Sequence, residues 1–252
     1  KHGFGFLFDS IGIFKLITYR RAKRANQEVV YLSRPQRLRM ALEELGPTFI
    51  KLGQLMSVRP DLIPAAYIIE LEKLQNNVPP FTFKQVRELC YENGIDIDRD
   101  FMSFESQPLA AASIAQVHRA QLNDGRAVAV KVQRPDIEKI VRTDLAILME
   151  ISEILEKKTD WASFYRVRDI VQELGQAVNS ELDFVSEANN IETFRRNFAG
   201  DNNIKIPAVI PEFSSRKVLT MEYLEGIKIS DFEALKKAKF DRKKIVDKLV
   251  DI

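Results

Sequence analysis

A segment of small residues, Ala110-Ala111-Ala112-Ser113-Ile114-Ala115-Gln116-Val117, is followed closely by the apolar stretch Val128-Ala129-Val130-Lys131. The residues from Val117 to Leu122 and from Ala127 to Val132 favour strands. Between them, Asn123-Asp124-Gly125 is a strong signal for a tight turn. This part of the chain therefore predicts an antiparallel β-hairpin with alanines before its first strand and a lysine near the end of its second.

The spacing of this hairpin matches the glycine-rich loop and lysine strand of protein kinases. In those proteins Gly-x-Gly-x-x-Gly-x-Val precedes a strand that carries Val-Ala-Ile-Lys. Here Ala110, Ala112 and Ala115 stand in the three glycine places, Val117 is the valine and Lys131 is the lysine. Glycine lets backbone amides approach phosphates closely, so three methyl groups should stiffen the loop and displace the phosphates. An alanine-rich hairpin alone fits plain packing, and a strand lysine alone fits a solvated surface; their joint spacing favours a nucleotide site.

The segments around the hairpin predict an α+β fold. Helical spacing extends from Ile137 to Leu155 and from Val167 to Phe198, and strands are expected at Ile204 to Val209 and Lys217 to Tyr223. Before the hairpin, Pro and Gly residues divide a helical region into short pieces. The expected pieces are a helix after Pro35, helices at 47–57, 64–74 and 84–92, and a linker at 76–80.

Three acidic residues on or near the second long helix are candidate partners for Lys131. They are Glu181, Asp183 and Glu187. A lysine that contacts phosphates needs a carboxylate to hold it in place. Asp183 and Glu187 are four residues apart, where like charges repel unless a cation lies between them. A solvated acidic face is the alternative, although Leu182 and Phe184 between the acids indicate partial burial.

The stretch from Val218 to Gly226 is an apolar strand that runs into a short linker. In a kinase this position is the fifth strand and hinge, where backbone groups bind adenine. Met221, Glu222 and Leu224 are the candidates for that contact. Without the hairpin upstream, the same stretch would be no more than a strand and a turn.

The composition excludes several classes of site. Thirty-eight basic and 36 acidic residues leave a net charge of +2, so no strong field attracts nucleic acid. The single cysteine, Cys90, excludes an intramolecular disulfide and a cysteine zinc site, and it fits a reducing compartment. With only two histidines, a histidine metal cluster is not expected, and no metal ligands are identifiable.

The first residues of the chain have an amphipathic pattern. Phe4, Leu7, Ile11 and Phe14 fall largely on one helical face, and the basic cluster at 20–24 follows. Such a segment can lie at a membrane surface, or it can pack onto its own domain. It is too short and too interrupted by charge to span a membrane.

The motif Lys51-Leu52-Gly53-Gln54 resembles the KxGQ signature of the UbiB/ADCK family of atypical kinases, which ordinary protein kinases lack. The alanine segment resembles the alanine-rich loop of that family, and Glu181-Leu182-Asp183 resembles its ExD motif. The resemblance covers roughly residues 34–226. It implies a kinase-like small lobe, with an antiparallel sheet and long helices, preceded by a family-specific helical extension that covers the nucleotide site.

The resemblance also assigns roles to residues. Lys131 and Glu187 take the places of the catalytic lysine–glutamate pair, and Lys51, Gln54, Glu181 and Asp183 those of the regulatory motifs. ATP or ADP with Mg²⁺ is the implied cofactor, and support of isoprenoid-quinone (ubiquinone-type) biosynthesis is the implied role. The implied location is cytoplasmic, peripheral at the inner face of the membrane, with quinone-precursor lipids and other quinone-biosynthesis proteins as partners. The nucleotide-binding candidates are Ala110, Ala111, Ala112, Ser113, Ala115, Val117, Lys131, Met221, Glu222 and Leu224.

The expected division of the chain is an amphipathic segment at 1–33, the KxGQ extension at 34–80, the small lobe at 81–226 and the start of a linker at 227–252. Phosphoryl transfer also needs a catalytic-loop Asp and a metal-binding Asp-Phe-Gly. His118-Arg119-Ala120 and Asp231-Phe232-Glu233 do not supply them. The large lobe is therefore expected to be absent and the fragment catalytically incomplete. A regulatory scaffold, whose nucleotide site acts only as a conformational switch, is the alternative.

Overall fold

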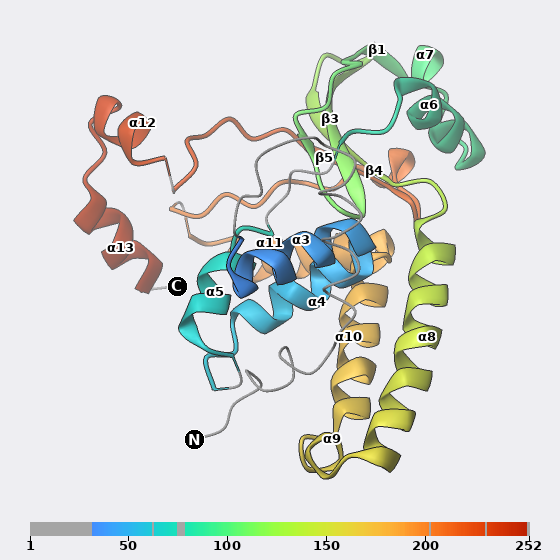
Figure 1. Ribbon diagram of the computed structural model, residues 1–252. Coiled ribbons are helices and arrows are strands. Elements are labelled where there is room, and N and C mark those ends of the chain that lie inside the picture. Colours follow the sequence, from blue (N-terminus) through green and yellow to red (C-terminus); the bar gives the residue numbers. More distant parts are fainter. Residues whose placement is uncertain (1–31, 62, 75–78, 202, 230, 251–252) are drawn as a thin grey trace, which may run out of the picture. The chain divides into compact units, whose positions relative to one another are not determined.

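The predicted hairpin is present and lies in the middle of a five-stranded antiparallel sheet (Figure 1). The computed structural model describes residues 32–61, 63–74, 79–201, 203–229 and 231–250. The strand order is β1-β3-β4-β5, and β2 pairs with the first half of β3. The strands are β1 Phe101–Phe104, β2 Ala110–Ala111, β3 Ala115–Leu122, β4 Ala127–Gln133 and β5 Val218–Glu222.

The turn between β3 and β4 depends on Gly125. Its φ of +90° lies in the left-handed region that glycine adopts without strain. The amide of Gly125 donates to the carbonyl of Leu122, and the amide of Leu122 donates to the carbonyl of Arg126, each at 2.9 Å. The Asn-Asp-Gly signal is therefore confirmed as the point where the chain reverses.

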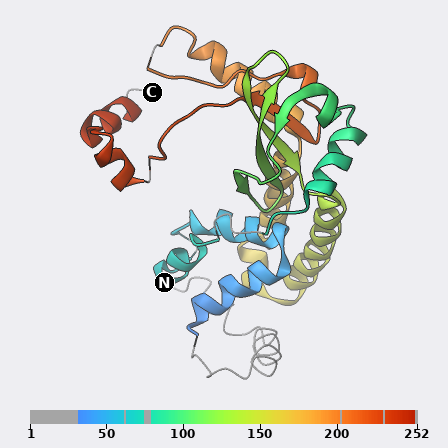
Figure 2. The ribbon, with the colours of Figure 1, turned by 90° about the horizontal axis from the view of Figure 1, so that it is seen from above.

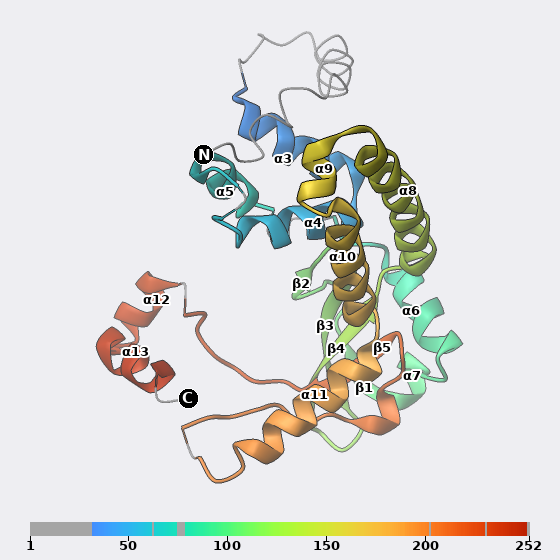
Figure 3. The ribbon, with the colours of Figure 1, turned by 90° about the horizontal axis from the view of Figure 1, so that it is seen from below.

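Helices cover both faces of the sheet. On one face, Val86 and Leu89 pack against a core that includes Val128 and Val130. On the other face, a second core joins Leu219 of β5 to the long helices. α8 and α10 of this second layer run side by side (Figures 1 and 3). The helices are α6 Phe83–Glu92, α7 Ile97–Asp100, α8 Ile137–Lys158, α9 Asp160–Phe164, α10 Val167–Glu181 and α11 Phe184–Asn197.

The helical extension before the sheet has its own core. It consists of α3 Arg34–Leu45, α4 Pro47–Ser57 and α5 Ala65–Leu71 (Figure 2). Ser33 caps α3 in a capping box with Gln36, and Gly46, with φ of +103°, separates α3 from α4. The helix α4 contributes to two cores: Phe49 and Met56 pack in the extension, whereas other side chains face the sheet layer. The extension therefore packs directly on the rest of the domain through α4.

Two expected elements differ from the structure. The helix expected at 167–198 is broken after Glu181, because Asp183 caps the start of α11 with its own side chain. The strand expected at Ile204 to Val209 is not a strand in the described part of the chain. It makes only an isolated bridge from Val209 to Met221, because Pro207 has no amide to donate to a ladder.

The remaining segments are short. A 3-10 turn, η1 Pro211–Phe213, precedes β5. From Tyr223 onward the chain forms a second compact unit with α12 Phe232–Lys237 and α13 Arg242–Val250. The amphipathic pattern at Phe4 to Phe14 lies outside the described residues. Among the helices that are described, none is long and apolar enough to cross a membrane.

Candidate nucleotide-binding site

Lys131 faces the sheet side that is covered by α11. Its neighbours in β4, Val130 and Val132, are fully buried in the opposite core. Because strand residues alternate between faces, Lys131 lies on the other side, paired across the ladder with Val117 and Leu219. The register, which the sequence left open, thus directs the lysine toward the long helices.

Lys131 forms an ion pair with Glu187 of α11, as expected. Its Nζ lies 2.8 Å from Oε1 and 2.6 Å from Oε2 of the carboxylate. The same ammonium lies 4.6 Å from the centre of the Phe184 ring. The side chains of Lys131 and Glu187 are 21% and 34% exposed, so water screens this pair only in part.

The corner between α10 and α11 places Glu187. The carboxylate of Asp183 accepts hydrogen bonds from the amides of Val185 (3.1 Å) and Ser186 (3.4 Å) and from the Ser186 hydroxyl (3.1 Å). Burial acts to raise the pKa of Asp183, but these hydrogen bonds outweigh it and hold the pKa below its ordinary value. Asp183 and Glu187 therefore have separate partners, and no cation needs to bridge them.

Gln133 fixes the same corner to the sheet. It lies two residues after Lys131 on β4 and is 1% exposed. Its side-chain amide donates to the carbonyl of Leu182 at 2.9 Å. The last carbonyls of a helix have no partner within the helix, and Gln133 supplies one here. One strand thus holds both the end of α10 and the first turn of α11.

The KxGQ residues point to different neighbours. Lys51 of α4 forms an ion pair with Glu181, the last residue of α10, and so links these two helices. Gln54 instead donates to the carbonyl of Leu74, within the helical extension, at 3.0 Å. A Cβ at Gly53 would collide with side-chain methyl groups of Leu74 and Leu42, which explains why glycine is needed there. The motif therefore combines one long-range contact with close packing of the extension.

The alanine segment forms a tight return between β2 and β3. Ala110 pairs with Val117 and Ala111 with Gln116. The amide of Ala112 donates to the carbonyl of Ala115 at 2.7 Å, which leaves Ser113 and Ile114 at the tip. The segment thus adjoins the strand pair that carries Lys131.

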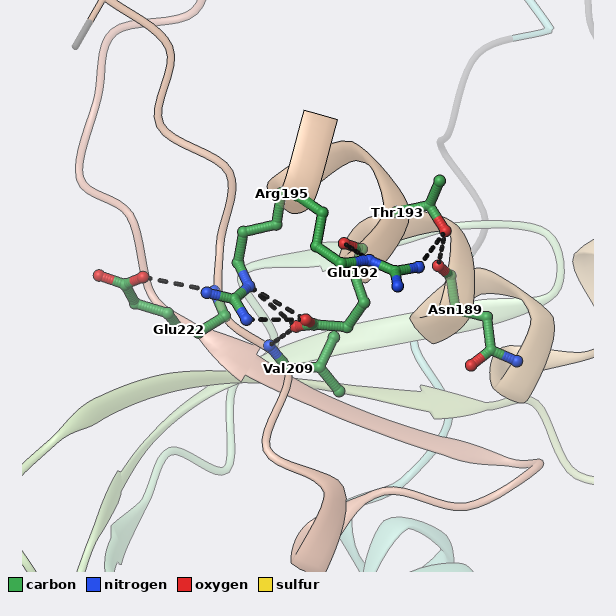
Figure 4. A network of polar contacts seen from close by, with 8 residues as sticks. Asn189, Glu192, Thr193, Arg195, Val209 and Glu222 are labelled. Carbon is green, nitrogen blue, oxygen red and sulfur yellow. Dashed lines mark hydrogen bonds and ion pairs between the residues drawn. The ribbon is translucent and has the colours of Figure 1, made fainter. Parts of the chain in front are cut away.

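Figure 4 shows a polar network between α11 and the end of β5. Glu192 of α11 accepts from the side chain of Arg195 and from the amide of Val209. The carboxylate of Glu222 pairs with Lys205 at 2.6 Å, and its amide donates to the carbonyl of Ala208. Hydrogen bonding to Lys205 lowers the pKa of Glu222, and hydrogen bonding to Arg195 lowers that of Glu192.

Two of the hinge candidates lie in β5: Glu222 belongs to this network, and Met221 precedes it in the strand. The third, Leu224, belongs to the second unit. The sequence analysis did not identify the network, because α11, Lys205, Val209 and Glu222 come together only in the folded chain.

The carboxylates near Lys131 do not fit a magnesium site in this arrangement. Glu187 is paired with Lys131, Glu181 with Lys51, and Asp183 caps α11. In the part of the chain that the structure describes, no three His, Cys, Asp or Glu side chains are grouped to hold a metal ion. We therefore assign none of these three carboxylates as a metal ligand.

Comparison with known proteins identifies the family. Residues 73–252 match the ABC1 atypical kinase-like domain. This chain belongs to the ABC1 family. A probable protein kinase UbiB from Cellvibrio japonicus is 40% identical over 222 residues, which are 88% of this chain and 40% of that protein. The chloroplastic protein ACTIVITY OF BC1 COMPLEX KINASE 7 from Arabidopsis thaliana is 40% identical over 220 residues, 85% of this chain and 31% of that protein.

A solved structure has a similar fold. The structure of Rv3197 from Mycobacterium tuberculosis, in complex with erythromycin, is 31% identical and has a TM-score of 0.54, covering 86% of this chain and 52% of that one. The chain spans less than half the length of the ABC1 relatives described above. The mixed α+β class and the resemblance to UbiB-type kinases are thereby confirmed.

Proposed function

We propose that this chain is the nucleotide-binding part of an ABC1 atypical kinase and that it binds ATP or ADP on the sheet face of Lys131. The observation that carries the proposal is the ion pair between Lys131 and Glu187. A protein kinase uses such a pair to hold the lysine on the α- and β-phosphates. The adjoining alanine segment and the membership of the ABC1 family support the same assignment.

Each candidate residue has a role in this proposal. Lys131 binds the phosphates, and Glu187 positions it. The alanine segment from Ala110 to Val117 covers the phosphates. Backbone groups of Met221 and Glu222, at the end of β5, bind adenine. Leu224, the third hinge candidate, is proposed on the sequence alone. Magnesium would enter with the nucleotide.

The KxGQ helix has a regulatory role in this proposal. Lys51 holds α4 on the end of α10 through Glu181, one residue before the corner that orients Glu187. Movement of α4 would therefore shift the corner between α10 and α11 and, with it, Glu187. Gln54 acts locally, where it binds the carbonyl of Leu74 at the end of the extension. Asp183 acts locally as the cap of α11. The extension at 34–80, the lobe at 81–226 and the linker from 227 remain our proposed division.

The wider role that we propose is support of isoprenoid-quinone biosynthesis at the inner face of a membrane. It is supported by the resemblance to proteins named UbiB. Its proposed partners are a lipid surface and other proteins of that pathway. We further propose that the 252-residue chain binds nucleotide without turning it over, since its sequence has neither a catalytic-loop Asp motif nor Asp-Phe-Gly.

Titration of the chain with a fluorescent ADP analogue tests the proposal. Lys131→Met should weaken binding by about tenfold or more, because a charge-assisted hydrogen bond contributes about 1.5–3 kcal/mol. Glu187→Gln should weaken it less, because Glu187 acts through Lys131. Lys84→Ala, on α6 at the other face of the sheet, is the matched control and should leave affinity unchanged. Equal ADP affinity in the wild type and Lys131→Met would refute the site.

A further inference from the structure

Arg134, which follows β4 directly, contacts three successive carbonyls of the alanine segment. Its backbone amide donates to the carbonyl of Ile114 at 2.7 Å. Its guanidinium donates through Nε to the carbonyl of Ser113 at 3.2 Å and through Nη2 to that of Ala112 at 3.3 Å. One residue thus holds the whole tip of the segment from the carbonyl side.

The guanidinium is itself held from a second direction. Its Nη2 also donates to the carbonyl of Pro79 at 3.0 Å, and its central carbon lies 5.4 Å from the centre of the Phe81 ring. Phe81 is fastened in turn, because its amide donates to the buried side chain of Gln116 at 3.1 Å. The linker before α6 and the strand β3 therefore fix the direction in which Arg134 points.

Arg134 makes no ion pair within the described part of the chain, and its partners are carbonyl oxygens. Burial lowers its pKa, with no carboxylate to offset the effect. Arginine nevertheless stays charged in proteins. A permanent positive charge therefore lies behind the alanine segment and favours an anion on the segment.

The hydrogen bonds from Arg134 set the direction of the backbone amides at the tip of the alanine segment. The described peptide bonds are all trans, so each carbonyl and the amide of the next residue point in opposite directions. Because Arg134 holds the carbonyls of Ala112 and Ser113, the amides of Ser113 and Ile114 point away from it. Within the described residues neither amide has a hydrogen-bond acceptor. Successive amides of this kind form a binding site for an anion.

We propose that Arg134 is a positioning residue for phosphate binding: it turns the amides of Ser113 and Ile114 outward so that they donate to a phosphate of the nucleotide. This inference rests on the proposed nucleotide site. It also explains how a loop without glycine can bind phosphate. Glycine gives kinase loops the freedom to present their amides, whereas here an arginine imposes the orientation from outside.

The test compares a ligand that has phosphates with one that lacks them. Fluorescent analogues of ADP and of adenosine are titrated into the wild type, Arg134→Gln, Arg134→Lys and the control Arg126→Gln. Arg126 lies at the far end of the same hairpin, paired with Asp124, and its replacement removes the same charge. Both Arg134 variants should bind the ADP analogue about tenfold more weakly and the adenosine analogue within about twofold of the wild type. Arg126→Gln should match the wild type for both ligands.

The outcomes separate this inference from the proposed function. Wild-type affinity for ADP in Arg134→Lys would mean that only the charge matters, and would overturn the positioning role. Equal losses for ADP and adenosine would show a general structural defect and would also overturn it. If Lys131→Met binds ADP as the wild type does, it is the nucleotide site that fails.

A second test uses only the wild-type protein, so it does not depend on whether a variant folds. In NMR spectra, the amide resonances of Ser113 and Ile114 should shift on addition of ADP and stay in place on addition of adenosine. Unshifted resonances at saturating ADP would refute the proposal.

Discussion

The ion pair between Lys131 and Glu187 has a stability effect that can be measured without nucleotide. Lys131→Met and Glu187→Gln keep the approximate size of each side chain and remove its charge. The two single variants and the double variant, with the wild type, form a thermodynamic cycle. The cycle isolates the interaction between the two side chains from the separate cost of each replacement.

The geometry sets the expected size of the coupling. Two unit charges about 4 Å apart attract by about 4 kcal/mol at an effective dielectric constant of about 20. Desolvation of the charges takes back part of this attraction. Exposed pairs contribute about 0.2–1 kcal/mol, whereas breaking a fully buried pair costs about 3–5 kcal/mol. With side-chain exposures of 21% and 34%, the Lys131–Glu187 pair lies between these cases, so we expect a coupling free energy of about 1–2 kcal/mol.

Urea unfolding of the four proteins, followed by circular dichroism, measures the coupling. The matched control is the pair Lys84 and Glu88 on α6, whose side chains are 84% and 57% exposed. The Nζ of Lys84 lies 3.7 Å from Oε1 of Glu88. The control cycle, with Lys84→Met and Glu88→Gln, should give about 0.5 kcal/mol or less. The double variant at Lys131 and Glu187 should be more stable than the sum of the single losses predicts.

A coupling at Lys131 and Glu187 that is no larger than the control would refute this reasoning. It would mean that the two side chains do not hold each other in solution. The carboxylate of Glu187 could then not position the lysine, and the proposed phosphate site would lose its main support.

Three further effects follow from the contacts described above. Gly53→Ala should lower the unfolding free energy by about 1 kcal/mol in urea titrations. Overpacking destabilises by about 1–3 kcal/mol, and the higher helix propensity of alanine offsets about 1 kcal/mol of this loss. Gly175→Ala, whose methyl group would make only ordinary contacts, should raise it by about 0.5–1 kcal/mol, and equal effects at the two sites would contradict the packing described. Hydrogen bonds from Ser186 lower the pKa of Asp183, so they stabilise the fold above about pH 4 and are lost as the pH falls further. Asp183→Asn should therefore flatten the fall in Tm between about pH 4 and 2. A dependence of Tm on pH equal to that of the wild type would argue against the cap. Ala112→Gly should change the ratio of ATP to ADP affinity more than it changes Tm, and an unaltered ratio would remove the loop methyl group from the argument.

Local chemistry made much of the fold predictable. The Asn-Asp-Gly turn requires a left-handed residue and finds it in Gly125. Pro47 begins α4 at the expected residue, and Asn93-Gly94 ends α6. Each of these signals acts within a few residues, so the sequence carries them without help from the rest of the chain. The missed break at Asp183 was also local, since an Asp ahead of a helical turn is a cap signal that the apolar periodicity obscured.

The sequence by itself determined the hairpin, the alanine segment and the lysine motif, and the resemblance named Glu187 as the partner of Lys131. The residues alone left three acids open. Tertiary packing decided among them, because the partners are 56 residues apart for Lys131 and Glu187 and 130 apart for Lys51 and Glu181. It also turned Gln54 toward Leu74 and set Arg134 behind the alanine segment. No local pattern encodes such contacts, since they depend on which faces of α4, α10 and α11 the cores bury against the sheet.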